Sequence, residues 1–488
     1  MNKFKTILLI ILLNGMVMPQ NYDFEQSLYY NYEFFKEKSL QNRFFKHSDV
    51  VRLITNLNKK NLFEVNVAGK SFEGREIFLL SVGSGTKKIF LWSQMHGDEP
   101  TATMALFDIF NFFSDTTQYQ DVKKLILEKT KIYFMPMVNP DGAEVFKRRN
   151  ALSIDLNRDA SRLQTPEAKI LMSVFDSLKA DFGFNLHDQN HRYSAGNSFK
   201  TAAISFLAPP INYEKQVDEV RLNAIKLIGS LFKMLNKYVP GHIAKYSDDY
   251  EPRAFGDTFQ RKGTSTILVE SGGWQNDPEK QFIRKLNFIL LLSVLKQIAE
   301  NSFVQTSESV YESIPFNEEK MFDVLLRNIT LEKNGTEIKI DIGINFEEVL
   351  AEDKKTVYKK ASIEDIGDLS VFFAYQDIDL SGYKIQEAKT YKAKNFTSEE
   401  LKNINLTDFY KQGYLTLCTK KEIRKEWFEY PINILSDNKK EVRTKFEIGA
   451  RPNFILKMNN RVDYVVINGF LHRVSESNNY EGNGLVFK

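Results

Sequence analysis

The chain contains 488 residues, 42% hydrophobic and 26% charged, so it can bury a large core and we expect more than one domain. Its formal net charge is only +3, and its Lys and Arg residues are spread along the chain rather than gathered in a stripe. A nucleic-acid-binding surface is therefore not expected. The single cysteine, Cys418, excludes an internal disulfide bond and a cysteine-rich metal site.

The first twenty residues are typical of a secretory signal. Lys3 and Lys5 precede an apolar run, residues 7–13, that is too short for a membrane span. The alternative is a buried N-terminal strand or helix, because a small-x-small cleavage site is missing before Pro19. We expect residues 1–20 to be a signal peptide and the protein to be periplasmic or secreted; without a signal it would be cytoplasmic.

Residues 22–62 are polar, aromatic-rich and helical in pattern, and from residue 63 short apolar runs alternate with longer amphipathic ones. This alternation predicts strands interleaved with helices around a mostly parallel sheet, an α/β fold. The expected strands are 89–92, 132–136, 182–186 and 265–269, and the expected helices are 102–113, 166–178 and 213–235.

Four residues able to carry hydrolytic chemistry lie at or just past the ends of predicted strands: His96, Glu99, His187 and Glu270. Open α/β sheets bind their ligands at this edge. Two imidazoles and one carboxylate leave Zn²⁺ an open position for water, and a second carboxylate can take the proton of that water. The residue types therefore predict a metallohydrolase.

The His-x-x-Glu spacing of residues 96–99 is a weak signal alone, because it arises often by chance. A rival metal motif pairs His187 with His191, four residues apart. Helical zincins, however, need Glu directly after the first histidine, and Asp188 stands there. His191 is expected to be a substrate-facing or surface residue on a loop.

After about residue 301 the pattern changes to strict alternation, typical of half-buried strands. Asn-Gly pairs at 334–335 and 468–469 stand between such runs and predict hairpins. We expect residues 301–488 to form a mainly β accessory region, a sandwich or two separate pieces. His472, its only histidine, has no partner at ligand spacing.

A set of short motifs resembles the zinc carboxypeptidases of the M14 type, in order and in rough spacing. The resemblance runs from about residue 45 to 300 and implies an α/β/α sandwich around a mixed, mostly parallel sheet. We therefore expect residues 21–300 to form a catalytic domain, and the resemblance does not cover residues 301–488. The motifs are residues 69–75, 96–99, 139–142 and 155–158, with His187 and Glu270.

The resemblance implies one Zn²⁺ ion held by His96, Glu99 and His187, with Glu270 as the general base. Asp155 matches the position that orients the first ligand histidine. Such an acceptor is expected, because a metal-binding imidazole usually donates the N–H of its other ring nitrogen to a neighbouring oxygen.

The same resemblance implies a grip for the carboxylate of the substrate. Asn157 and Arg158 match the pair that binds the terminal carboxylate, which suits a planar guanidinium; a surface salt bridge is the alternative for Arg158. By spacing, Arg148 rather than Arg149 fits the arginine that stabilises the oxyanion. Tyr250 best matches the mobile tyrosine, with Tyr246 as the alternative and a packing role equally open.

At two positions the sequence leaves the substrate undetermined. Asp98 stands where the digestive members of the zinc carboxypeptidase family carry arginine. Asp257 would favour a substrate with a basic C-terminal residue if it points into the side-chain pocket, but not if it pairs with Arg253. The leading expectation is a carboxypeptidase acting on peptides. The alternatives are an amidohydrolase or deacylase acting on small acylated amino acids, a cell-wall peptide hydrolase and, least favoured, a non-catalytic binding module. No membrane span is expected beyond the signal.

Overall fold

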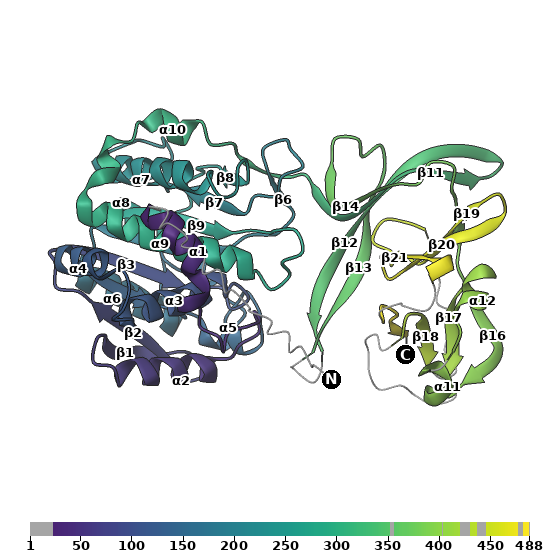
Figure 1. Ribbon diagram of the computed structural model, residues 1–488, viewed down its shortest axis with the longest axis horizontal. Coiled ribbons are helices and arrows are strands. Elements are labelled where there is room, and N and C mark those ends of the chain that lie inside the picture. The colour runs from purple at the N-terminus through teal and green to yellow at the C-terminus, as the bar shows by residue number, and fades with distance from the viewer. Residues whose placement is uncertain are drawn as a thin grey trace, which may run out of the picture.

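The computed structural model describes residues 23–351, 356–402, 404–419, 430–436, 446–476 and 482–487. The predicted signal peptide, residues 1–20, lies outside these ranges. Figure 1 shows an N-terminal part in which helices cover a sheet and a C-terminal part dominated by strands. Within the described ranges, no helix combines the length and the apolar composition needed to cross a membrane.

An eight-stranded mixed sheet forms the centre of the N-terminal part, and the neighbouring pairs β4–β3, β3–β5, β5–β9 and β7–β8 are parallel. The antiparallel pairs are β1–β2, β2–β4 and β9–β7. In order across the sheet the strands are β1 (Glu64–Lys70), β2 (Glu76–Val82), β4 (Thr130–Met135), β3 (Lys87–Ser93), β5 (Phe182–Asp188), β9 (Ser265–Ser271), β7 (Ile204–Leu207) and β8 (Ile243–Lys245).

Helices cover both faces of this sheet, because alternate side chains of each strand point to opposite faces. On β3, Ile89 and Leu91 join one apolar cluster, whereas Phe90 and Trp92 join the other. The first cluster includes side chains of α1 (Phe24–Phe35), α2 (His47–Asn58), α3 (Thr101–Ser114), α4 (Gln120–Lys129), α7 (Glu219–Leu235) and α9 (Gln281–Glu300), and the second those of α6 (Pro166–Leu178) and α8 (Phe255–Arg261). The predicted α/β/α sandwich is confirmed.

The local signals explain where two helices begin. α6 has the predicted bounds, with Pro166 in its first turn and the Thr165 side chain accepting a hydrogen bond from the N–H of Ala168. The prediction that a helix starts at residue 213 is wrong. α7 starts at Glu219, because Asp218 caps it by accepting the N–H of Arg221.

The C-terminal part contains two sheets. The larger has the order β13-β12-β11-β15-β19-β20-β21, with β14 also paired to β11, and the smaller is entirely parallel, β16-β17-β18-β22. Their strands are β11 (Met321–Lys333), β12 (Thr336–Leu350), β13 (Val357–Gly367), β14 (Phe373–Asp379), β15 (Lys384–Glu387), β16 (Lys389–Phe396), β17 (Tyr414–Thr419), β18 (Asn433–Ser436), β19 (Phe454–Met458), β20 (Arg461–Ile467), β21 (Phe470–Arg473) and β22 (Val486–Phe487). Both predicted hairpins form, with positive φ at Asn334, Gly335, Asn468 and Gly469.

The smaller sheet gives this part some α/β character, because α11 (Ser398–Lys402) and α12 (Thr407–Lys411) lie between β16 and β17. One apolar cluster contains Leu417 and Ile434 of the smaller sheet together with Val465 and Ile467 of the larger. The two sheets therefore share a core.

The remaining short elements include a two-stranded sheet that joins the two parts of the chain. In it, β10 (Asn317–Glu319) pairs with β6 (Tyr193–Ala195). The others are α5 (Pro140–Glu144), α10 (Glu308–Glu312), η1 (Leu156–Arg158), η2 (Ser302–Gln305) and η3 (Val474–Glu476).

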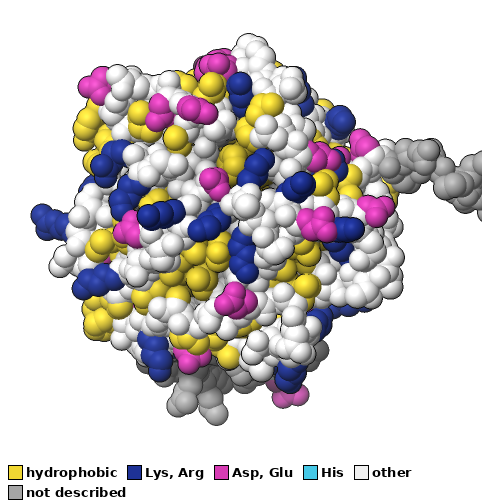
Figure 2. Space-filling view, turned by 90° about the vertical axis from the view of Figure 1, so that its left-hand side faces the viewer, with side chains coloured by type: hydrophobic (Ala, Val, Ile, Leu, Met, Phe, Trp, Pro, Cys, Tyr) yellow, Lys and Arg dark blue, Asp and Glu magenta, His cyan; other side chains and the backbone are white. Residues whose placement is uncertain are grey.

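Figure 2 looks onto the end of the molecule formed by the N-terminal part. On this face Lys and Arg side chains are interspersed with Asp and Glu. Such mixed charge does not create the one-sign field that attracts a polyanion.

A fully buried ion pair ties α3 to α9. Arg284 Nη2 lies 2.5 Å from Asp108 Oδ1, and both side chains are completely inaccessible to solvent. The Tyr32 hydroxyl donates to the other carboxylate oxygen at 2.9 Å, and Arg284 also donates to the carbonyls of Glu37 and Leu40. These hydrogen bonds compensate the cost of burying two charges.

Replacing Asp108 by Asn should therefore lower the free energy of unfolding by about 3–5 kcal/mol, because Arg284 would stay buried without a countercharge. Urea denaturation followed by tryptophan fluorescence measures this loss. The matched control is Glu128→Gln, which breaks the exposed Lys124–Glu128 pair and should cost less than about 1 kcal/mol. Equal, small losses in both variants would contradict this view of the pair.

Candidate metal centre

The carboxyl ends of the parallel strands β3, β5 and β9 bring His96, Glu99, His187 and Glu270 to one edge of the sheet. His187 and Glu270 are direct partners in the β5–β9 register, so their side chains leave the same face. His96 and Glu99 stand in the turn between β3 and α3. Gly97 makes this turn possible, because a Cβ there would lie 2.0 Å from the carbonyl carbon of Gly142.

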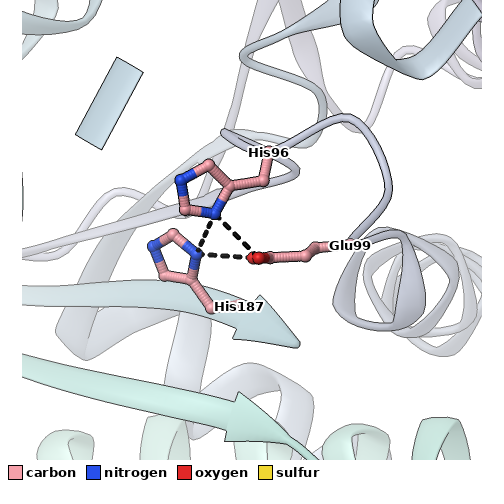
Figure 3. A group of neighbouring side chains, drawn as sticks. All are labelled: His96, Glu99 and His187. Carbon is pink, nitrogen blue, oxygen red and sulfur yellow. Dashed lines mark hydrogen bonds and ion pairs between the residues drawn. The ribbon is translucent and has the colours of Figure 1, made fainter. Parts of the chain in front are cut away.

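Three of these side chains converge on one point (Figure 3). His96 Nδ1 lies 2.8 Å from Glu99 Oε1, and His187 Nδ1 lies 2.7 Å from Glu99 Oε2. The two Nδ1 atoms are 3.2 Å apart. One ligand atom from each of the three buried residues lies within 4.8 Å of the others, so the group can hold a metal ion.

The donor set fits a zinc ion. Asp155 Oδ1 lies 2.9 Å from His96 Nε2, so this nitrogen donates its proton to Asp155 and leaves a lone pair on Nδ1. That lone pair faces Glu99 and the Nδ1 atom of His187, and a cation between them satisfies all three. In a tetrahedral site with bonds of about 2.1 Å, ligand atoms lie about 3.4 Å apart. The two Nδ1 atoms are close to this spacing at 3.2 Å, and the Glu99 oxygens lie nearer, at 2.7 and 2.8 Å.

Without a cation, protons and nearby carboxylates set the charges of this group. Although burial lowers the pKa of His96, the charge of Glu99 and the hydrogen bond to Asp155 raise it to about 9. Burial lowers the pKa of His187. Burial also raises the pKa of Glu99, but the two imidazoles outweigh it and hold that pKa well below its usual range.

Arg148 lies beside the metal centre, although its side chain is partly exposed to solvent. Its Nη1 donates to Glu99 Oε1 at 2.9 Å and its Nε to Asp155 Oδ2 at 3.1 Å. Against the effect of burial, His96 and Arg148 lower the pKa of Asp155. Both arginines are exposed, but Arg149 donates to the carbonyl of Ser153. Of the two arginines considered, Arg148 is the one that the structure brings to the site.

Asn157 and Arg158 closely follow Asp155, whose Oδ1 accepts the Asn157 N–H at 2.9 Å, and both side chains already have protein partners. The Phe255 N–H donates to Asn157 Oδ1 at 3.0 Å. Arg158 Nε lies 3.4 Å from Glu251 Oε2. Glu251 in turn accepts from Arg253 with both oxygens, at 2.9 and 2.6 Å. A carboxylate of the chain itself therefore stands beside the predicted carboxylate grip.

Glu270 is partly buried, and burial together with the charge of Glu99 raises its pKa well above the usual range. Burial, followed by the charge of Glu270, raises the pKa of Tyr246. The Tyr250 ring packs edge-on against Tyr213, with 5.0 Å between centroids. Tyr246 is therefore electrostatically linked to the site.

The two aspartates that left the substrate open both lie in buried surroundings. Burial, followed by the charge of Glu99, raises the pKa of Asp98 to about 6. Burial also raises the pKa of Asp257 to about 6, although its Oδ1 accepts the Glu251 N–H at 3.0 Å. Arg253 pairs with Glu251 rather than with Asp257.

Lys280, at the start of α9, is a supporting residue that the sequence did not reveal. Its Nζ donates to the Ser271 carbonyl at 2.9 Å and lies 3.2 Å from Asp188 Oδ2. These two acceptors directly follow Glu270 and His187, so the buried ammonium ties the ends of β5 and β9 together. Ten residues after Glu270, Lys280 belongs to no motif.

Gln94 was also missed, and it supports the turn before the first ligand. It adopts a left-handed backbone conformation, with φ of 50°, and its side chain donates to the Gly97 carbonyl at 3.0 Å. Nothing in a single sequence indicates this conformation for a glutamine. A strained, buried residue next to a candidate metal ligand is typical of functional sites.

Part of the chain is similar to known proteins. Residues 50–204 match the zinc carboxypeptidase family, Peptidase M14. Carboxypeptidase SOL1 of Arabidopsis thaliana is 28% identical over 135 residues, 24% of this chain and 28% of SOL1. Carboxypeptidase 2 of Trichophyton rubrum is 29% identical over 140 residues, 27% of this chain and 25% of that protein.

Among solved structures, a metallo-carboxypeptidase from Burkholderia cenocepacia is similar at 15% identity with a TM-score of 0.44, over 53% of this chain and 70% of that one. This chain spans about a quarter of the length of SOL1 and of the Trichophyton enzyme. The family match confirms the predicted resemblance to zinc carboxypeptidases. It includes His96, Glu99 and His187 and ends before Glu270.

Metal affinity should rise with pH up to about 9, the pKa of metal-free His96. A pKa above the ordinary value means that the imidazole carries a proton below pH 9, and zinc must displace that proton. Competition with a chromogenic chelator between pH 6 and 9 measures the affinity. His47→Gln, a change outside the centre, should leave the profile unaltered; a flat profile in the unmodified protein would argue against His96 as a ligand.

Proposed function

We propose that the protein is a zinc-dependent carboxypeptidase that hydrolyses the C-terminal bond of peptides. The observation that carries this proposal is the convergence of His96 Nδ1, His187 Nδ1 and the Glu99 carboxylate next to Glu270. In it, one zinc ion is held by the two histidines and Glu99. The lysine-flanked apolar run of residues 1–20 favours a periplasmic or secreted enzyme.

A bound zinc ion supplies Lewis acidity, which polarises a carbonyl and makes water more acidic. The raised pKa of Glu270 suits a group that accepts a proton from water and then donates it to the leaving amine. Arg148, already next to Glu99, provides positive charge where the carbonyl oxygen becomes negative. Asp155 holds the His96 ring through its Nε2 atom and fixes the tautomer.

In this reaction Asn157 and Arg158 bind the terminal carboxylate of the substrate. Since Asn157 Oδ1 accepts the Phe255 N–H, the amide nitrogen is the group left to donate to a carboxylate. The Arg158 side chain is 41% exposed, which leaves its guanidinium accessible from solvent. A terminal carboxylate that pairs with it must compete with Glu251.

The position of Glu251 also favours a second candidate, an amidohydrolase or deacylase with the same metal centre. If Glu251 stays paired with Arg158, a substrate without a free carboxylate binds beside Arg158 without leaving an unpaired charge. A non-catalytic binding module is less well supported, because the possible metal ligands and Glu270 stand together.

The variant Glu270→Gln should keep its zinc and lose turnover by a factor of about 10² or more, because the proton acceptor is gone while the ligands remain. Metal analysis and assays on peptides with free or amidated C-termini test this, and wild type should cleave only the free ends. Arg149→Gln is a control away from the site. Loss of zinc in Glu270→Gln would make Glu270 a ligand, and equal cleavage of both ends would favour the amidohydrolase.

Two substitutions at the carboxylate grip should move KM in opposite directions. Glu251→Gln removes the competing charge, so KM for a free C-terminus should fall about two- to five-fold. Arg253→Gln removes the other partner of Glu251 and should raise KM by a similar factor, about two- to five-fold. Steady-state kinetics measure both, with little change expected in kcat. Shifts in the same direction, or none, would show that Glu251 does not compete with substrate.

A further inference from the structure

A cavity of about 530 Å³ lies between the two parts of the chain. One wall is formed by the loops that follow β5 and β9, residues 190–192 and 273–277. The other wall comes from the larger C-terminal sheet, through Phe346, Tyr375 and Phe470. Its volume is in the range of ligand-binding sites.

The loops that line this cavity follow the two strands that carry His187 and Glu270. Lys280 lines the cavity. Its side chain donates to the carbonyl of Ser271, which follows Glu270, and lies beside Asp188, which follows His187. Lys280 thus links the lining of the cavity to the ends of β5 and β9.

The cavity and the carboxylate grip lie on opposite sides of the sheet edge. Arg158 stands next to Asn157, which is bonded to the start of α8, on the face that α6 and α8 cover. The cavity reaches the start of α9, which covers the other face. A peptide with its terminal carboxylate at Arg158 and its scissile bond at the metal centre would thus extend its upstream residues toward the cavity.

The wall contributed by the C-terminal sheet suits an extended peptide. β14 pairs only with β11 among the described strands, and its residues Tyr375 and Gln376 line the cavity. An edge strand can hydrogen-bond to the main chain of a peptide. Next to it, the Phe346 and Phe470 rings lie 4.6 Å apart and offer an apolar surface to a side chain.

Several contacts fix this wall relative to the catalytic part. Asp323 Oδ1 lies 2.7 Å from His191 Nε2, and Arg192 donates to Asp323 Oδ2 at 2.9 Å. The Tyr375 hydroxyl donates to the His191 carbonyl at 2.7 Å. His191, expected at the surface or the substrate, thus has a partner in β11, and the cavity is preformed.

We propose that this cavity binds the residues of a peptide substrate that lie upstream of the scissile bond. The peptide main chain lies along the edge of β14, and an apolar side chain packs against Phe346 and Phe470. The C-terminal β region is then part of the substrate-binding site. This inference rests on the proposed peptidase function.

The test is a series of N-acetylated peptides of three to eight residues with the same two C-terminal residues, chosen as the best pair from a panel. Wild type should show kcat/KM about ten-fold higher for the longest than for the shortest, through KM. Phe470→Ala should reduce this ratio to near one. Gln376→Trp, which fills the cavity from an exposed position, should do the same if Phe470→Ala fails to fold.

The matched control is Ile338→Ala, an exposed apolar residue of β12 that does not line the cavity, and it should keep the wild-type ratio. Absence of length dependence in wild type, or an unchanged ratio in Gln376→Trp, would overturn the proposal. A protein that cleaves none of the peptides contradicts the proposed function instead. Fluorescence anisotropy with a labelled octapeptide then decides about the cavity, because Gln376→Trp should weaken that binding as well.

Discussion

His96 Nδ1, His187 Nδ1 and the Glu99 carboxylate converge on a buried point, where a shared proton or a cation can offset the repulsion between their lone pairs. Against the effect of burial, the charge of Glu99 and the hydrogen bond to Asp155 raise the pKa of His96 to about 9, so this point favours a positive charge. Asp155 supports either state, since it accepts the N–H on the far side of the ring. Asp155 thus keeps His96 Nδ1 turned toward Glu99 and His187.

The sheet makes this convergence possible because parallel strands end at a common edge. β3 and β5 are neighbours, as are β5 and β9, so residues about 90 positions apart in the chain need no long loops to meet. Packing then restricts their movement. The edge carries Gly97, whose lack of a side chain lets two turns touch, and Lys280, which bonds to two strand ends at once.

How far the sequence predicts these features depends on whether their cause is local. α6 and both Asn-Gly hairpins agree with prediction because capping and turn residues act within a few positions. The start of α7 was misplaced since the apolar pattern continues into residues before its cap at Asp218. Lys280 and Glu251 could not be found, because their roles arise from contacts between distant segments. The smaller sheet could not be predicted as a separate sheet, because its short strands pair in parallel with segments that lie far apart in the chain.

The contacts of Glu251 indicate how a site with its own carboxylate can still accept another. Its oxygens lie 2.9 and 2.6 Å from Arg253 but 3.4 Å from Arg158. Glu251 can therefore leave Arg158 and keep Arg253, its closer partner. Arg253 holds Glu251 through two parallel, charge-assisted N–H···O bonds, which are stronger than a single ion contact. Since these groups are partly exposed, the exchange costs little free energy. In the proposed carboxypeptidase, a terminal carboxylate would thus displace Glu251 from Arg158 while Glu251 keeps its bonds to Arg253.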